Sequence, residues 1–397
     1  MGLNVIIGTD SLQRPLTGVG RYTFELCRKL VADPQIDQIT GFDFGRFHSI
    51  ENRLEKLARD DSDGGHFEGR QFPTLRSALS KSAMATKIYE LYMSRVCERI
   101  LRGRSGALFH SPNFHLPGKP DHSIITVHDL SFLLHPQYHP RVRLGWMNSM
   151  VPAALRDCSH IISVSHSTKS DLVRHFHLDP DSISVTHLGV GESFRPRDFA
   201  VIDDTVGALG LRCNGYFLCV ATLEPRKNLE GLIAAYLALE PALRKHIPLV
   251  LAGGFGWKCR NLRSLVGSLK TEGVIYLGYI NEATLPLLYN GARCFVYPSF
   301  YEGFGLPVLE AQASGIPVIS SDVSSIPEVA NCEAILVDPG SRDQITSALR
   351  RSLEDDAWSV RCRASGLRKA AEFSWEKCAM ATTQVYQMVQ SGFAKKP

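Results

Sequence analysis

A Gly-rich segment in the second half of the chain carries two glutamates eight residues apart, Glu302 and Glu310. The segment follows a predicted strand and enters a helix whose first turn is marked by Pro307. Free backbone N–H groups at the start of that helix suit a phosphate; they belong to Phe304, Gly305 and Leu306. The eight-residue spacing alone is weak evidence for a site. The strand before it, the glycines within it and the helix after it predict that both carboxylates face one ligand crevice.

A second candidate is the adjacent pair Arg226 and Lys227, in the string Glu-Pro-Arg-Lys-Asn. The pair follows a predicted strand, and open α/β sheets bind ligands at the carboxyl ends of their strands. A diphosphate needs fixed cations there, with Arg as a planar fork and Lys as a point charge. The alternative is a solvated pair of surface charges.

Two further candidates lie in the first half. Gly18 and Gly20 follow the first predicted strand and open a helix. Thr23 takes the place of the last glycine of a G-x-G-x-x-G, which disfavours a dinucleotide, yet the backbone can still approach a ligand closely. His128 and Asp129 end another predicted strand. For His128 a structural role and a ligand-facing role both remain open.

Short apolar runs that alternate with helical patterns must position these residues. Runs that are apolar on both faces are typical of buried parallel strands. Two such series predict two doubly wound α/β domains. The boundaries expected are 1–194, a linker at 195–213, and 214–373; Glu51–Arg70 is expected to be a polar loop. The predicted strands are Leu3–Gly8, Ile39–Phe44, Ala107–His110, Ile124–Val127, Ile161–Val164, Ile183–His187, Tyr216–Val220, Pro248–Ala252, Val274–Leu277, Cys294–Tyr297, Pro317–Ser320 and Ala334–Val337.

Composition excludes several classes of protein. The 397 residues are 44% hydrophobic and 21% charged, which excludes global disorder. The net charge of +4 is too small for a dedicated nucleic-acid binder. Ten scattered cysteines without a C-x-x-C indicate neither a disulfide frame nor a zinc site. With no signal peptide and no uncharged apolar run of ~18 residues, we expect a soluble cytoplasmic protein.

These strings together resemble the retaining glycosyltransferases of family 4. The resemblance rests on Glu302-x7-Glu310 within Glu-Gly-Phe-Gly-Leu-Pro, on the Glu-Pro-Arg-Lys-Asn block, on Gly-x-Gly-Arg-Tyr, on His-Asp and on the final Phe-Ser-Trp-Glu. It covers nearly the whole chain and implies the GT-B fold, two Rossmann-like domains facing a cleft. A final helix, 374–397, would cross back to the N-terminal domain, which holds the acceptor, while the C-terminal domain holds a sugar nucleotide.

The resemblance also implies roles for the candidates. Arg226 and Lys227 would hold the donor diphosphate, and Glu310 the ribose. The other donor contacts would come from Glu302 and the backbone of Phe304, Gly305 and Leu306, with Gly18, Gly20 and Gly253 also at the donor and His128 near the anomeric carbon. No cofactor and no metal is expected, because no Asp-x-Asp ends a cleft-facing strand.

The resemblance implies transfer of a hexose, mannose or D-rhamnose, with retention. The donor would be a GDP-sugar and the acceptor a saccharide or polyprenyl-linked saccharide, in bacterial cell-surface polysaccharide synthesis. Gly254–Lys258 and Val323–Glu328 look like segments of O-antigen mannosyl- and rhamnosyltransferases. A UDP-sugar donor is the alternative, and a non-catalytic sugar-nucleotide-binding scaffold is the alternative of another class. Phosphorylases, epimerases and nicotinamide dehydrogenases lack support in the motifs.

One basic stretch suggests a membrane surface. Arg76–Arg104 holds seven Lys or Arg against two Glu, with apolar residues among them. This mixture suits peripheral contact with an anionic membrane. A charged outer face on a core helix is the equal alternative.

Overall fold

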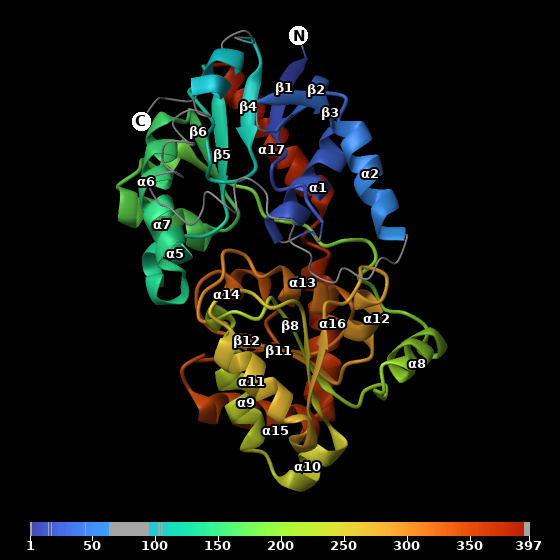
Figure 1. Ribbon diagram of the computed structural model, residues 1–397. Coiled ribbons are helices and arrows are strands. Elements are labelled where there is room, and N and C mark those ends of the chain that lie inside the picture. Colours follow the sequence, from blue (N-terminus) through green and yellow to red (C-terminus); the bar gives the residue numbers. More distant parts are fainter. Residues whose placement is uncertain are drawn as a thin grey trace. The chain divides into compact units, whose positions relative to one another are not determined.

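The computed structural model describes residues 2–14, 16, 18–43, 45–62, 95–101, 104 and 106–392. The chain divides into two compact units, each built on its own sheet (Figure 1). The first unit comprises Met1–Leu133, Arg141–His187 and Trp375–Pro397. The second comprises Leu134–Pro140 and Leu188–Ser374, so a short segment of the first half belongs to the second unit.

The sheet of the first unit has seven strands in the order β3-β2-β1-β4-β5-β6-β7. All neighbours pair in parallel except β2 and β3. Strands β4, β5 and β6 are buried throughout, as expected of parallel strands covered on both faces. The bounds are β1 Leu3–Gly8, β2 Ile36–Asp43, β3 Arg46–Ser49, β4 Leu108–Ser111, β5 Ser123–Val127, β6 His160–Ser163 and β7 Ile183–Val185.

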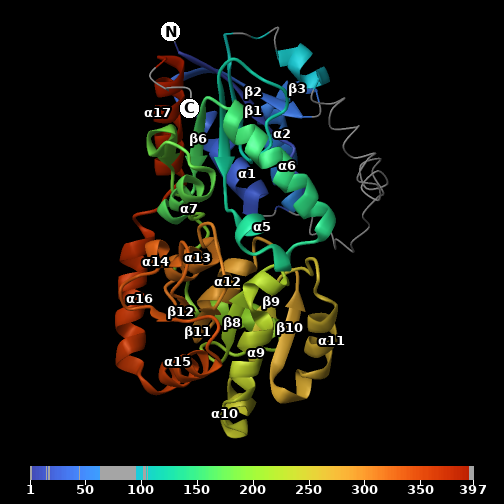
Figure 2. The ribbon, with the colours of Figure 1, turned by 90° about the vertical axis from the view of Figure 1, so that its left-hand side faces the viewer.

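The helices of this unit bury one face against the sheet. In α1, Tyr22, Leu26 and Leu30 are fully buried at the four-residue spacing of a helix face. Helix α17 packs on α1 and carries the end of the chain to this unit (Figures 1 and 2). The bounds are α1 Gly18–Leu30, α2 Ile50–Ser62, α5 Ser131–Leu134, α6 Arg141–Asp157, α7 His166–Phe176 and α17 Trp375–Gln390, with a 3₁₀ turn at Pro180–Ser182.

The sheet of the second unit has six parallel strands in the order β10-β9-β8-β11-β12-β13. The order reverses between β8 and β11, which is the point at which doubly wound sheets bind ligands. With the first sheet, it confirms the predicted fold class of two Rossmann-like units. The bounds are β8 Phe217–Val220, β9 Leu249–Ala252, β10 Val274–Gly278, β11 Cys294–Tyr297, β12 Val318–Ser321 and β13 Ile335–Val337.

The helices of the second unit pack in pairs over this sheet. Helix α13 contacts α16, and α9 contacts α15. Val308, Leu309 and Ala311 of α13 are fully buried, so this helix is part of the core. The bounds are α8 Phe199–Ala208, α9 Leu229–Leu237, α10 Pro241–His246, α11 Arg260–Ser268, α12 Leu285–Asn290, α13 Leu306–Ala313, α14 Ile326–Val329, α15 Arg342–Glu354 and α16 Asp356–Ala370, with 3₁₀ turns at Pro136–Tyr138, Pro225–Lys227 and Lys270–Glu272.

Every predicted strand is present, with β1 and β11 at the predicted bounds. Two expectations about the connections differ from the structure. The expected loop Glu51–Arg70 begins as helix α2, because Ile50 and Leu57 bury one of its faces. The expected linker 195–213 contains α8, whose Ile202 and Val206 are buried, and it belongs to the second unit.

Three other expectations concern the whole chain. The cysteines are free thiols. No helix in the part of the chain that the structure describes is both long and apolar enough to cross a bilayer. Most of the basic stretch Arg76–Arg104 lies outside the described residues.

A buried polar network ties α17 to the first sheet. The hydroxyl of Tyr386 in α17 lies 2.6 Å from Nδ1 of His110 in β4. Nε2 of His110 lies 2.8 Å from the Thr126 hydroxyl in β5. Tyr22 of α1 reaches the same Thr126 hydroxyl at 3.1 Å. Burial, with a smaller contribution from His128, lowers the pKa of His110 to about 3. The imidazole is therefore neutral at physiological pH.

This histidine makes the first unit sensitive to acid. Between pH 6.5 and about 3 the unfolded chain binds a proton at His110 that the folded chain does not. The free energy of unfolding should therefore fall as the pH drops through this range, by up to ~1.4 kcal/mol per pH unit from this residue. His110→Gln should make the fall shallower in urea denaturation. Exposed His122→Gln is the control, and equal slopes for wild type and His110→Gln would contradict the prediction.

Candidate active site

Two loops of the second unit meet at the reversal point of its sheet. Strands β8 and β11 are neighbours, so the segments that follow them leave the sheet side by side. After β8 the chain forms a single 3₁₀ turn, Pro225–Lys227, which ends at Asn228 in the left-handed region (φ 56°). The backbone N–H of Phe300, in the loop after β11, donates to the Arg226 carbonyl at 2.9 Å. These contacts bring the predicted cations to the predicted carboxylate.

The ammonium of Lys227 is held by Glu302. Nζ donates to Oε1 of Glu302 at 2.7 Å and to Oε2 at 3.0 Å. It also donates to the hydroxyl of Tyr297, at 2.8 Å, and that hydroxyl in turn donates to Oε1 of Glu302 at 3.0 Å. Lys227 and Glu302 are only 8% and 6% exposed. The alternative of a solvated Arg-Lys pair is therefore wrong for Lys227.

Arg226 bridges the same loops. One guanidinium nitrogen donates to the Tyr301 carbonyl at 2.7 Å and to Oε2 of Glu302 at 3.4 Å. The other donates to Oε1 of Glu224 at 3.1 Å. Its side chain is 13% exposed, so the cation is held in place at the edge of a largely buried cluster.

The cluster keeps Glu302 ionised. Burial by itself would raise the pKa of this carboxyl, but Lys227 and Arg226 outweigh burial and hold the pKa below its ordinary value. Burial, and then the charge of Glu302, raise the pKa of the Tyr297 hydroxyl well above its ordinary value. The site therefore presents two fixed cations and an anionic carboxylate that already has donors on both oxygens.

The backbone of Glu302 is fixed as well. Its N–H donates to the Ser324 hydroxyl at 2.9 Å, and the Ser325 hydroxyl donates to its carbonyl at 2.9 Å. Helix α13 then begins after Gly305, which has φ +109°, a conformation that favours glycine. In the first turn Pro307 carries no N–H, and the Val308 N–H donates to the Gly305 carbonyl at 3.0 Å, so a phosphate here would use the N–H groups of Gly305 and Leu306. The Phe304 ring is buried edge-on against Phe373, so only its backbone could face a ligand.

Glu310 lies eight residues after Glu302, inside helix α13. It is 8% exposed and accepts a hydrogen bond from the Tyr289 hydroxyl of α12 at 3.0 Å. Burial, followed by the Glu310 charge, raises the pKa of Tyr289 well above its ordinary value. This tyrosine orients one oxygen of the carboxylate.

Gly253 has a structural explanation of its own. It follows β9 with φ +134°, and a Cβ there would overlap the carbonyl oxygen of Ala221. Its N–H donates to the Gly278 carbonyl at 2.7 Å. The loop after β9 therefore packs directly on the loop after β8, which requires glycine.

In the first unit, His128 and the Gly18–Tyr22 turn come together. Nε2 of His128 donates to the Pro112 carbonyl at 2.8 Å, and its ring meets the Tyr22 ring edge-on with centroids 4.9 Å apart. Burial lowers its pKa, although Pro112 and Asp129 oppose this. The neutral ring then has Nδ1 as its acceptor. A Cβ on Gly20 would come within 2.8 Å of the Ser11 carbonyl oxygen, whereas the space around Gly18 is open.

The structure thus assembles the candidates as two separate groups. Arg226, Lys227 and Glu302 are in direct contact in the second unit. Sequence reasoning missed the roles of Tyr297, Ser324 and Ser325, which hold Glu302 in place. Tyr297 is the last residue of β11, directly before the Gly-rich loop. This position in the sequence could have indicated that it contacts the site.

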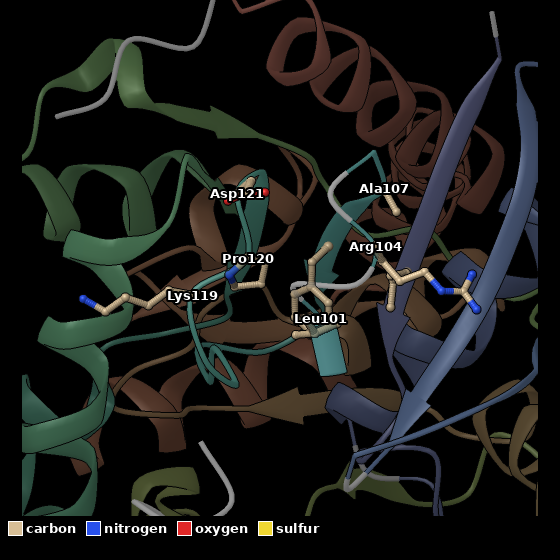
Figure 3. Close-up of a pocket in the computed structure, with 8 residues that line it drawn as sticks. Leu101, Arg104, Ala107, Lys119, Pro120 and Asp121 are labelled. Atoms are coloured by element: carbon tan, nitrogen blue, oxygen red, sulfur yellow. The ribbon is translucent and has the colours of Figure 1, made fainter. Parts of the chain in front are cut away.

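A hollow in the first unit contains none of the candidates. It lies between β1, β4 and the approach to β5, lined by Leu101, Arg104, Lys119 and Asp121 among others (Figure 3). Its volume of about 10 Å³ has room for about one water molecule. It is therefore no ligand site.

The sequence and the fold match known glycosyltransferases. Residues 16–194 match the family described as Glycosyltransferase Family 4, and residues 214–369 match Glycosyl transferases group 1. The O-antigen chain mannosyltransferase B of Escherichia coli is 36% identical over 392 residues, which are 98% of this chain and 100% of that protein.

Solved structures agree on the fold. Sucrose-phosphate synthase from Thermosynechococcus elongatus superposes with a TM-score of 0.69 at 20% identity, over 98% of this chain and 100% of that one. WaaG, a glycosyltransferase involved in lipopolysaccharide biosynthesis, does so with 0.67 at 13% identity, over 96% and 99%. The chain is a member of glycosyltransferase family 4 and has the GT-B fold.

Proposed function

We propose that this protein transfers a hexose, mannose or D-rhamnose, from a GDP-sugar to a saccharide or polyprenyl-linked saccharide, with retention of configuration. The product would be part of a bacterial O-antigen or a similar cell-surface polysaccharide. The full-length similarity to an O-antigen chain mannosyltransferase supports the sugar and the class of polymer. UDP-sugar transfer is the second candidate for the donor.

The observation that carries the proposal is the pair of fixed cations beside α13. Lys227 is held by Glu302 and the Tyr297 hydroxyl, and Arg226 by Glu302, Glu224 and the Tyr301 carbonyl. Fixed positive groups next to a helix N-terminus suit the diphosphate of a sugar nucleotide. They are most effective when charge grows on the leaving phosphate, because they need no reorganisation at that moment.

The transfer step follows from these charges. The bond between the anomeric carbon and the phosphate oxygen breaks, and its electron pair goes to the nucleoside diphosphate. The acceptor hydroxyl oxygen bonds to the anomeric carbon from the same face, and its proton passes to the leaving phosphate oxygen. Arg226 and Lys227 stabilise the charge on that phosphate.

Retention in this scheme needs no enzyme nucleophile. Retaining glycosidases use a carboxylate as nucleophile. Glu302 is badly suited to that role, because Oε1 has Lys227 and Tyr297 as donors and Oε2 has Lys227 and Arg226. We assign it to the donor sugar and to holding Lys227. This supports attack from the front face.

The remaining donor contacts are assigned by position. Glu310, whose carboxylate is oriented by Tyr289, would accept from the ribose hydroxyls. Gly18, with open space around it, would let the backbone approach the diphosphate. Neutral His128 would contact the sugar near the anomeric carbon. Gly20, in the first turn of α1, and Gly253, in the loop after β9, would act through the shape of the backbone.

No metal or cofactor is needed in this account, because two protein cations and the α13 N-terminus meet the diphosphate charge.

The acceptor would be reached at an anionic membrane surface, which the basic stretch Arg76–Arg104 suits. A sugar-nucleotide-binding scaffold without catalysis is the contrasting class. Release of free sugar from the donor in the absence of acceptor would exclude it.

Variants of the carboxylates should separate chemistry from binding. Glu302→Gln should lower kcat on the order of 10²-fold, since Lys227 loses its charged partner, and should weaken nucleoside-diphosphate binding much less than that. Glu310→Gln should mainly raise KM for the donor, because ribose contacts are equal in the ground and transition states. Steady-state kinetics and calorimetric titration measure both. A near-wild-type kcat for Glu302→Gln would overturn the role assigned to this residue.

The donor base and the metal are tested together by thermal shift. Of GDP, UDP, ADP and TDP, GDP should raise the melting temperature most. A ligand that binds the folded but not the unfolded state raises the melting temperature more the more tightly it binds. The shift should be the same in EDTA as with manganese or magnesium. Stabilisation by UDP alone would defeat the GDP assignment, and a shift that disappears in EDTA would defeat metal independence.

A further inference from the structure

A cavity of about 280 Å³ lies in the second unit beside the Arg226–Lys227 turn. It is bounded by the start of α9, the start of α11 and the loop after β11, and its lining includes Tyr138, Glu224, Leu262 and Phe300. Its volume is just below the ~300–1,000 Å³ of small-molecule pockets. It can hold a sugar ring or two but is too small for a whole sugar nucleotide.

Glu224 gives this cavity an unsatisfied acceptor. The residue is 3% exposed, and its Oε1 accepts from Arg226 at 3.1 Å. Its Oε2 is buried and has no hydrogen-bond donor among the described residues. A buried carboxylate oxygen without a donor is costly. It therefore calls for a ligand that brings an O–H or N–H group.

Two aromatic rings form one wall. Tyr138 and Phe300 stack with centroids 5.6 Å apart and planes 15° from parallel. Hydrogen bonds to the backbone hold both residues in place. Trp257 Nε1 donates to the Tyr138 carbonyl at 2.8 Å, and the Phe300 N–H donates to the Arg226 carbonyl at 2.9 Å. Aromatic surface beside a buried carboxylate that lacks a donor suits a ligand that has an apolar face and hydroxyl groups.

The charges around the cavity disfavour an anion. Glu224 and Glu230 line it, against one cation, Lys258, whose Nζ donates to the Gln137 carbonyl at 2.7 Å. A phosphate or a nucleotide would meet the two carboxylates. A neutral polyhydroxyl ligand meets no such penalty, and its hydroxyl can supply the donor that Glu224 lacks.

We propose that this cavity is a saccharide subsite, separate from the donor site, that holds a sugar unit of the acceptor glycan. A hydroxyl of that unit donates to Oε2 of Glu224, and its C–H face packs on Phe300. The identity of the glycan rests on the proposed function. The subsite would keep the growing chain on the enzyme between transfers.

Filling the cavity tests the subsite. Leu262 of α11 lines it and is 4% exposed, so Leu262→Trp should occupy its space. Ser264→Trp adds the same ring at an exposed position of the same helix and is the matched control. Calorimetric titration with linear α-linked mannotetraose, with the donor site saturated by GDP, measures binding. Leu262→Trp should weaken it at least tenfold, and Ser264→Trp by less than twofold.

Phe300→Leu is the second variant, because it removes the aromatic wall with a small change in volume. It should weaken mannotetraose binding while GDP affinity, measured alone, stays within twofold in all three variants. Unchanged GDP affinity also shows that Leu262→Trp is folded. GDP binding without any mannotetraose binding by the wild type, or equal binding by Leu262→Trp, would overturn the subsite. Loss of GDP binding in the wild type with mannotetraose binding retained would instead count against the proposed donor.

Discussion

The two loops at the reversal point of the second unit's sheet are held together by a buried ion pair between Lys227 and Glu302. Each comes from a loop that follows a different strand, and the two strands are neighbours in the sheet. Taking two charges out of water is expensive, and only short contacts with further hydrogen bonds offset the cost. Tyr297 and Arg226 supply those bonds. Removal of either charge would leave its partner buried and uncompensated, so the pair fixes both loops at once.

Other residues of the second unit hold the two loops in the positions that this ion pair requires. Gly305 lets the chain turn into α13 directly after the Glu302 loop, and the hydroxyls of Ser324 and Ser325 hold the loop from the next segment. Gly253 lets the loop after β9 pack on the loop after β8. In the first unit too, side chains after parallel strands meet: His128 follows β5, and the first turn of α1 follows β1 of the same sheet.

The sequence predicts the parallel strands well because each is a short run that is apolar on both faces. Strand β3, Arg46–Ser49, was not predicted, because this short antiparallel edge strand has no such run. The start of α2 was predicted to be a loop, because the charged stretch around Ile50 and Leu57 hides a narrow apolar face. The motifs singled out Arg226, Lys227 and Glu302, which the structure places in direct contact. The contacts of Tyr297 could not be predicted, since its partner Lys227 is 70 residues away and only the tertiary fold joins them.

The central claim is that Lys227 and Glu302 act as one unit that stabilises the leaving diphosphate. A double-mutant cycle on kcat/KM with Lys227→Met, Glu302→Gln and the double variant tests it most directly. The account predicts strong non-additivity: the double variant should lose little more activity than Lys227→Met alone, with a coupling energy of ~1–3 kcal/mol. Losses that simply multiply, with a coupling energy near zero, would contradict it.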